Sequence, residues 1–203
     1  QSRFYENVIG RSRAFCSVIY PWLKEHFAPR LDNVTEDAFY RMINKSQPSL
    51  IRTEADELTY CLHIMVRYEL EKRMFDGTLT AHDLPAEWNR LYKEYLGIDV
   101  PDDRQGVLQD SHWANGNIGY FPSYAIGSAY GAQYLLELSK VLDVAAVVRS
   151  GDLTPINNWL EEKIWKYGCM KNPVALFESV CGKFDPDCYV AYLEKKFTEV
   201  YDL

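Results

Sequence analysis

The sequence predicts an all-α protein, and three observations lead to this fold class. Apolar residues recur at intervals of three and four through most of the chain, which is the spacing of a helix that buries one face. Pairs such as Pro48-Ser49, Asp76-Gly77, Asn172-Pro173 and Asp185-Pro186 divide this pattern into segments of helical length. The chain also lacks internal repeats, low-complexity tracts and linkers. We therefore expect residues 1–203 to form a single α-helical region.

Start and stop signals place the expected helices along the chain. Pro21 should kink or end the first helix, because proline interrupts the hydrogen bonds of a helix interior. Thr35 resembles the start of the second helix, and Gly97 stops the fourth. The expected helices cover 1–27, 35–43, 51–75, 82–96, a stretch 130–148 that runs back toward Ser123, a helix with Pro155 in its first turn, 172–180, and a last helix opened by Asp185-Pro186.

The segment 51–75 is expected to be a long central helix around which the chain is organised. It carries one apolar stripe and further apolar residues outside it, so it should occupy a core position. Glu54 projects onto the apolar arc, and buried ionisable groups are rare unless they are paired or used in chemistry. His63 shares a face with Asp56 and Arg67, which favours an ion-pair network over a metal ligand. The stripe consists of Leu58, Cys61, Leu62, Met65 and Tyr68, with Ile64, Val66 and Leu70 outside it.

Composition excludes several classes of protein. A net charge of −7 argues against nucleic-acid binding, since neutralising phosphates requires a basic surface. No apolar run reaches the roughly 18 to 20 residues of a membrane span. The five cysteines are odd in number and form no Cys-x-x-Cys pair, which favours reduced thiols in a cytoplasmic protein. The opening Gln1-Ser2-Arg3 has no initiating Met, which suggests that the gene begins further upstream.

Two stretches carry the residues that could perform chemistry. The first, 52–57, places three carboxylates and a guanidinium at the expected start of the central helix, where a cap with solvated ion pairs is the simpler interpretation. The second runs from 100 to 131, is rich in glycine and aromatic residues, and follows no regular period. We expect it to be a long ordered loop, and such loops are usually functional. Within it, His112, Tyr120 and Tyr124 could donate to a polar substrate, or aromatic packing could simply hold the loop.

These two stretches resemble the signatures of a known family. Residues 51–57 read Ile-Arg-Thr-Glu-Ala-Asp-Glu, which matches the Ile-Arg-Thr-x-Ala-Asp-Glu signature of the M32 metallocarboxypeptidases, the thermostable Taq-type carboxypeptidases. Residues 106–113 match their Gly-x-x-Gln-Asp-x-His-Trp signature in full. The resemblance extends over essentially the whole chain. It implies the C-terminal part of a helical, gluzincin-like zinc-peptidase fold, with a long central helix and a glycine- and aromatic-rich active-site loop.

The chain departs from the family in its metal ligands. Members hold zinc through His-Glu-x-x-His and a later Glu in His-Glu-Ser-Gln, and neither motif occurs here. Gln1 would be the last letter of the second motif, so the metal-binding Glu would lie just before it. The resemblance therefore implies zinc or cobalt in the full-length enzyme, with no metal ligand in this chain, and it implies that residues 1–203 alone are inactive toward peptides.

The resemblance also implies roles for individual residues. Arg52 would hold the free C-terminal carboxylate of a peptide, together with Gln109 and Tyr120, because a guanidinium recognises a carboxylate through two hydrogen bonds. His112 and Tyr124 would donate to the oxyanion of the tetrahedral intermediate, with Tyr120 closer to the substrate carboxylate. We expect Asp56 or Glu57, with Glu54 and Asp110, to accept hydrogen bonds from metal ligands or other site residues and so to orient them.

The implied partners follow from the same resemblance. They are a peptide substrate with a free C-terminus, the missing N-terminal half of the protein, and a second copy in a homodimer when the enzyme is complete. Neither nucleic acid nor a membrane is expected as a partner. The alternative is a non-enzymatic helical interaction module that derives from such a peptidase. That alternative explains the absent metal ligands, but it does not explain why both signatures remain.

Overall fold

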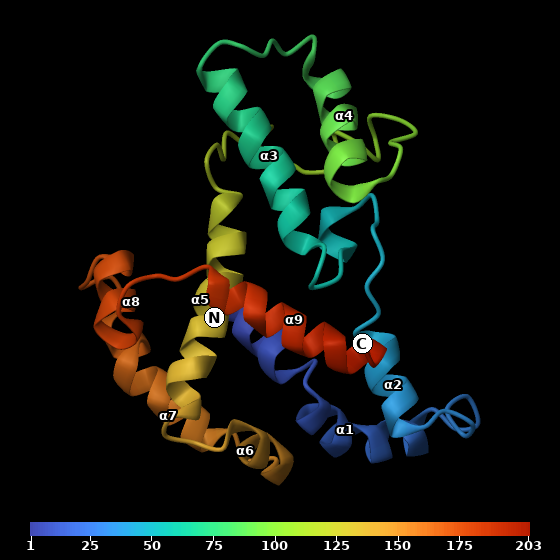
Figure 1. The fold of residues 1–203 in the computed structure, drawn as a ribbon, viewed down its shortest axis with the longest axis vertical. Coiled ribbons are helices and arrows are strands. Elements are labelled where there is room, and N and C mark those ends of the chain that lie inside the picture. Colours follow the sequence, from blue (N-terminus) through green and yellow to red (C-terminus); the bar gives the residue numbers. More distant parts are fainter. The chain divides into compact units, whose positions relative to one another are not determined.

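The computed structural model describes all 203 residues, and every regular element in it is helical (Figure 1). The all-α prediction is confirmed. The chain divides into two compact units, residues 1–44 with 127–203 and residues 45–126. The elements are a π-helix Phe4–Ile9, α1 Arg13–His26, α2 Glu36–Ile43, a 3₁₀ helix Arg52–Glu54, α3 Tyr60–Phe75, α4 Leu84–Leu96, α5 Pro122–Ser139, α6 Val144–Ser150, α7 Thr154–Lys163, a 3₁₀ helix Trp165–Tyr167, α8 Pro173–Cys181 and α9 Asp187–Tyr201.

The unit of residues 45–126 is built on the pair α3 and α4 (Figure 1). Gly97 ends α4 in the left-handed conformation that glycine adopts without strain, at φ 73°. A smaller cluster around Phe121 packs against the beginning of α3. The main core between the two helices contains Val66, Leu70, Leu79, Trp88, Leu91, Tyr92 and Leu96.

The central helix is shorter than predicted, because it begins at Tyr60 rather than at residue 51. Asp56 explains the difference. Its carboxylate accepts the backbone N–H groups of Leu58 and Thr59 at 2.9 and 3.0 Å, and its carbonyl accepts that of Tyr60 at 3.0 Å, so Asp56 caps the turn that leads into α3 and residues 51–55 stay outside the helix. Glu54 therefore belongs to the short 3₁₀ helix and is exposed, and the prediction that it lies on a buried apolar arc is wrong.

The face of α3 that is buried also differs from the prediction. Leu58, Met65 and Tyr68 of the predicted stripe are 39 to 46% exposed. The buried face carries polar residues beside apolar ones, because loop residues from far along the chain satisfy the polar groups. Its members are Tyr60, His63, Ile64, Val66, Arg67, Leu70 and Glu71.

The first predicted helix is two elements in the structure. The π-helix Phe4–Ile9 ends at Gly10, and α1 starts anew after Ser12, whose hydroxyl accepts the N–H of Phe15 at 3.1 Å. Pro21 lies inside α1 and does not end it. These elements belong to the unit of residues 1–44 and 127–203. Its core joins the π-helix and α1 to α5, α6 and α7 through Phe4, Ile9, Ala14, Leu138, Val148, Ile156 and Leu160.

The predicted helix 130–148 is likewise divided. α5 ends at Ser139, and α6 begins after Asp143, which accepts the N–H of Ala146 at 2.9 Å. Thr35 and Asn172 cap α2 and α8 as predicted. None of the helices, α5 with its 18 residues included, is both long enough and apolar enough to cross a membrane.

Candidate active site

A buried carboxylate between two guanidinium groups forms the centre of the site. Asp110 receives hydrogen bonds from Nη2 and Nε of Arg52 at 2.6 and 3.0 Å, and from Nε of Arg67 at 2.7 Å. The three side chains are 10%, 7% and 0% exposed, so these ion pairs are almost completely removed from solvent. Asp110 thus joins the 52–57 signature to the 106–113 signature through one carboxylate.

The two arginines differ in their remaining hydrogen-bonding capacity. Arg67 uses all five N–H groups: beyond Asp110, it donates to the His63 carbonyl, the Tyr92 hydroxyl and the Gln109 side-chain carbonyl. Arg52 donates three, the third going from Nη1 to the hydroxyl of Tyr60 at 3.1 Å. Two N–H groups of Arg52 are left to bind another molecule, and Arg67 has none.

Gln109 joins the same two segments. Its side-chain carbonyl accepts from the backbone N–H of Arg52 at 2.9 Å and from Nη2 of Arg67 at 3.0 Å. Its amide nitrogen donates to the backbone carbonyls of Leu50 and Gln105 at 3.0 and 2.8 Å. Both donors and both lone pairs of this amide are therefore occupied within the protein.

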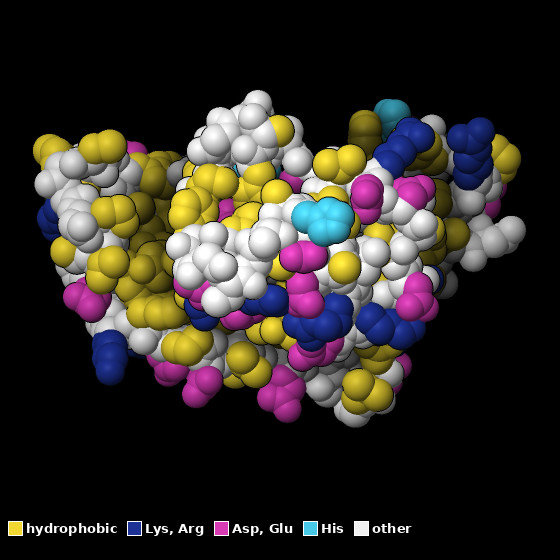
Figure 2. Space-filling view, turned by 90° about the horizontal axis from the view of Figure 1, so that it is seen from above, with side chains coloured by type: hydrophobic (Ala, Val, Ile, Leu, Met, Phe, Trp, Pro, Cys, Tyr) yellow, Lys and Arg dark blue, Asp and Glu magenta, His cyan; other side chains and the backbone are white.

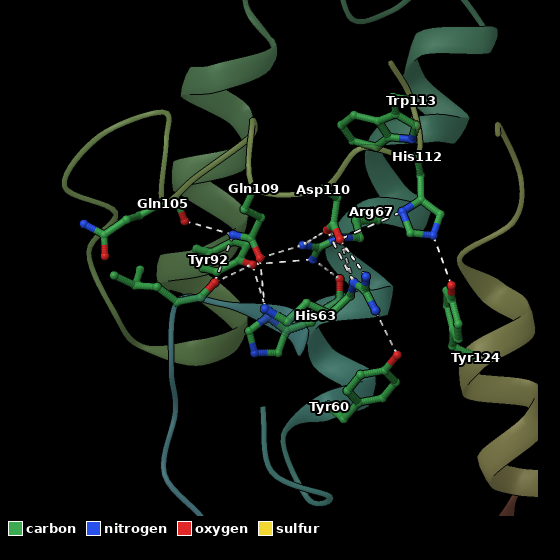
Figure 3. A network of polar contacts seen from close by, with 12 residues as sticks. Tyr60, His63, Arg67, Tyr92, Gln105, Gln109, Asp110, His112, Trp113 and Tyr124 are labelled. Carbon is green, nitrogen blue, oxygen red and sulfur yellow. Dashed lines mark hydrogen bonds and ion pairs between the residues drawn. The ribbon is translucent and has the colours of Figure 1, made fainter. Parts of the chain in front are cut away.

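His112 and Tyr124 meet directly. Nε2 of His112 lies 3.0 Å from the Tyr124 hydroxyl, while Nδ1 is buried without a hydrogen-bond partner, 3.9 Å from the carboxylate of Asp110. The imidazole packs on Phe121 at 4.5 Å between ring centroids and stacks near Tyr120 at 5.9 Å. Tyr120 itself is 52% exposed. Figure 3 shows His112 between the Asp110 centre and Tyr124.

The pKa shifts in this cluster follow from burial and the two arginines. Burial raises the pKa of Asp110, but hydrogen bonds and charge from Arg52 and Arg67 outweigh it, so the pKa lies below its usual range. Burial lowers the pKa of Arg52, and pairing with Asp110 reverses this to a net increase. Burial raises the pKa of Tyr124. Asp110 is therefore a carboxylate at neutral pH, and Tyr124 keeps the proton that it can donate.

His63 is a neutral member of the network. Nδ1 lies 3.1 Å from the Tyr92 hydroxyl, and the side chain is completely buried. Burial, followed by the charge of Arg67, lowers its pKa to about 4. The network that the sequence suggested around His63 does contain Arg67, but the contact of its imidazole is with Tyr92 on α4 instead of with Asp56.

The low pKa of His63 predicts how stability depends on pH. Since the folded protein resists protonation, the unfolded chain takes up this proton first. The free energy of unfolding should therefore fall as pH decreases from about 6.5 to about 4, by up to about 1.4 kcal/mol per pH unit. Urea titrations across this range should show the slope reduced in His63→Gln and retained in His82→Gln, a change at an exposed histidine. An unchanged slope in His63→Gln would contradict the assignment.

The other predicted carboxylates lie in different surroundings. Asp56 receives five hydrogen bonds from its own neighbourhood, including those from Ser46, Gln47 and the Thr59 hydroxyl at 2.8 to 3.0 Å. It therefore fixes the turn before α3. Glu57 is 3% exposed, and Glu54 is exposed. Of the three, Glu57 is the carboxylate that burial makes suitable for orienting another group.

Sequence reasoning did not assign Arg67, Tyr60, Tyr92 or Glu71 to the site. Arg67 and Glu71 lie on one face of α3, and Tyr92 faces them from α4. A signal was present, since His63, Arg67 and Glu71 follow one another at intervals of four residues. The apolar stripe that seemed to define the buried face lies elsewhere on the helix.

The geometry defines a class of protein. A histidine and a tyrosine hydroxyl meet beside an arginine with two unused N–H groups, all within one polar cluster on a helical frame. Such a set of donors can bind an anionic group and stabilise negative charge that develops nearby. This arrangement defines a helical protein with a candidate site for a ligand that carries an anionic group.

Comparisons with known proteins identify the family. Residues 1–197 match the model of the Carboxypeptidase Taq (M32) metallopeptidase family. Carboxypeptidase 1 of Bacillus subtilis (strain 168) is 42% identical over 203 residues, which cover 99% of this chain and 40% of that protein. Thermostable carboxypeptidase 1 of Pyrococcus furiosus is 41% identical over 97% of this chain and 40% of its own length. The structure of an M32 carboxypeptidase from Deinococcus radiodurans R1, 38% identical, superimposes with a TM-score of 0.96 over 100% of this chain and 41% of that one.

The chain belongs to the Carboxypeptidase Taq (M32) metallopeptidase family. The resemblance seen in the sequence is thereby confirmed. The chain spans about 40% of the length of the curated relatives that it matches. No group of three or more His, Cys, Asp or Glu side chains in the structure is arranged to hold a metal ion. The residues present therefore do not make up the metal site that the family name implies.

Proposed function

We propose that this chain is the part of a metallocarboxypeptidase that binds the free C-terminus of a peptide and donates hydrogen bonds to the reacting carbonyl. The supporting observation is that Asp110 joins Arg52, with its two unused N–H groups, to the loop on which His112 meets Tyr124. The guanidinium carbon of Arg52 lies 5.1 Å from the Tyr124 ring centroid. One substrate could therefore contact both groups.

Each side chain of this proposal has a role that fits its contacts. Arg52 binds the substrate carboxylate, because it combines a fixed charge with unused donors. Tyr124 donates its hydroxyl proton to the negative charge that develops on the carbonyl oxygen, and His112 orients that hydroxyl or donates beside it. Tyr120 is exposed and can approach the carboxylate end of the substrate. Gln109 has no hydrogen-bonding position left, so we now assign it to positioning rather than to substrate binding.

The metal of this proposal comes from outside the 203 residues. Zinc, or cobalt in its place, would polarise the scissile carbonyl and activate a water molecule. Its ligands would belong to polypeptide that the relatives have beyond the matched region, and the 203-residue chain alone would then not cleave peptides. Glu57, as a buried carboxylate, is our candidate for orienting a metal-binding histidine.

An exposed apolar face of α3 supports the proposal that further polypeptide carries the metal ligands. Met65 and Tyr68 of α3, with Leu58 just before it, are exposed to solvent, although exposed side chains of this size are usually covered by other polypeptide when they cluster. Hydrophobic side chains also lie among charged ones on the face shown in Figure 2. We propose that the polypeptide carrying the metal ligands packs on the α3 face. The homodimer and the cytoplasmic location stay predictions.

Arg52→Lys tests the proposed carboxylate contact. Lysine keeps the charge but lacks the planar pair of donors, so recognition of a free C-terminus should weaken by about 10- to 100-fold. The measurement is kcat/KM of the full-length protein for matched peptides that end in a carboxylate or in an amide. The preference for the free acid should fall in Arg52→Lys and stay the same in Arg104→Lys, a change at an exposed arginine. An unaltered preference in Arg52→Lys would remove Arg52 from substrate binding.

A further inference from the structure

Three ionisable residues form a row on the buried face of α3. His63, Arg67 and Glu71 are spaced four residues apart, so their side chains project in nearly the same direction along the helix. Their exposed fractions are 0%, 0% and 5%. Each contacts residues of another segment, namely Tyr92 of α4 or the loop 109–119. None of the three belongs to either signature.

Glu71 holds the loop after His112. Its Oε1 atom accepts a hydrogen bond from the indole Nε1 of Trp113 at 2.7 Å and another from the backbone N–H of Gly119 at 3.2 Å. Gly119 has a φ of 73°, a left-handed conformation that suits glycine. The two ends of the segment 113–119 are thereby tied to one carboxylate oxygen.

Arg67 holds the loop before His112. It binds both the carboxylate of Asp110 and the side chain of Gln109, as described above. His112 is therefore flanked by one tether two residues upstream and another one residue downstream, and both tethers come from α3. Between them, the imidazole has one hydrogen-bond contact, which is Tyr124.

The two hydrogen bonds to the loop account for a carboxylate at position 71. Burying a carboxylate costs free energy, and both of its donors, Trp113 and Gly119, are neutral. An apolar side chain in its place would leave the indole N–H of Trp113 and the backbone N–H of Gly119 without an acceptor. The carboxylate fixes the positions of the Trp113 indole and of the loop backbone at Gly119.

We propose that Arg67 and Glu71 are positioning residues that fix the loop on both sides of His112 and so direct its Nε2 atom at the Tyr124 hydroxyl. Neither residue touches substrate in this proposal. The expected effect on catalysis rests on the proposed function, whereas the expected effect on the position of the His112 ring does not.

The catalytic test compares Glu71→Ala with Glu71→Gln in the protein as its gene encodes it. Displacing a catalytic group by a small distance can cost about 100-fold in rate, so kcat should fall by about 10- to 100-fold in Glu71→Ala with little change in KM. Glutamine keeps a carbonyl acceptor for Trp113 and Gly119, and should retain most of the turnover. Glu69→Ala, on the other side of α3, is the matched control and should behave like the unaltered protein.

The geometric test uses the 203-residue chain and does not depend on activity. The chain has four histidines, so the His112 ring signals can be assigned in a ¹⁵N-histidine NMR spectrum with a His112→Gln variant. The Nε2 signal of His112 should move in Glu71→Ala and in Tyr124→Phe, but not in Glu69→Ala. An unmoved signal in folded Glu71→Ala would overturn the proposal, as would equal losses of kcat in Glu71→Ala and Glu71→Gln. If the unaltered protein cleaves no peptide while the signal moves, the proposed function fails and the positioning role stands.

Discussion

Asp110→Ala should lower the free energy of unfolding by about 3 to 5 kcal/mol, the cost of removing one partner from a buried ion pair. The change leaves the guanidinium groups of Arg52 and Arg67 without their shared carboxylate in a region almost free of solvent. Asp110 also joins the two signature segments, so its loss leaves Gln109 to hold them together. No other single side chain in the cluster pairs with two buried charges.

Urea unfolding of the 203-residue chain measures this effect. Asp99→Ala is the matched control, because Asp99 pairs with Lys93 at 2.8 Å but is 85% exposed, and exposed pairs contribute about 0 to 1 kcal/mol. Similar losses in the two variants would contradict a buried, doubly paired Asp110.

The same ion pairs give a second readout in pH. Since the pKa of Asp110 is lower in the folded than in the unfolded protein, its stabilisation is fully present above the unfolded pKa of about 3.9. It is lost as pH falls through the lower folded pKa. Asp110→Asn should lack this part of the acid dependence, and it should keep the loss between about pH 6.5 and 4 that belongs to His63.

Tyr124→Phe should lower kcat by about 100- to 1,000-fold in the protein as its gene encodes it, with little change in KM. This is the usual cost of removing one hydrogen-bond donor from a developing oxyanion. The ring stays, so its packing against Phe121 and its contact with Arg52 are kept. Only the hydroxyl that meets His112 is lost.

Steady-state kinetics on a peptide with a free C-terminus measures the Tyr124 effect. Tyr201→Phe removes a hydroxyl from a 44% exposed tyrosine of α9 and should leave kcat unaltered. A kcat for Tyr124→Phe equal to that of the unaltered protein would exclude Tyr124 from the mechanism.

Helix positions could be predicted where a local side chain sets the boundary. Thr35 and Asn172 each cap the helix that follows them, and both starts were visible in the sequence. Ser12 and Asp143 act in the same way. In each case the helical spacing of apolar residues continues across the boundary between two helices, so the spacing does not reveal that boundary. Asp56 was expected within the first turn of a helix that starts at residue 51, and its role as the cap of a later start appears only in its contacts with Leu58 and Thr59.

The site could be predicted only as far as its two signatures reach. The structure brings Arg52, Asp110, His112 and Tyr124 into one polar cluster. The buried face of α3 was misjudged, because a helical pattern assigns charged residues to solvent. The side chains that make Arg67 acceptable in the interior, those of Tyr92, Gln109 and Asp110, lie more than 20 residues away in sequence, so no local pattern contains them.

The segment 114–118 is exposed throughout, yet Glu71 binds both the residue before it and the residue after it. Two backbone N–H groups of the segment, those of Asn115 and Asn117, also donate to the carbonyl of His112 at 3.1 and 2.9 Å, so a change in the backbone of this exposed segment would act on His112 directly.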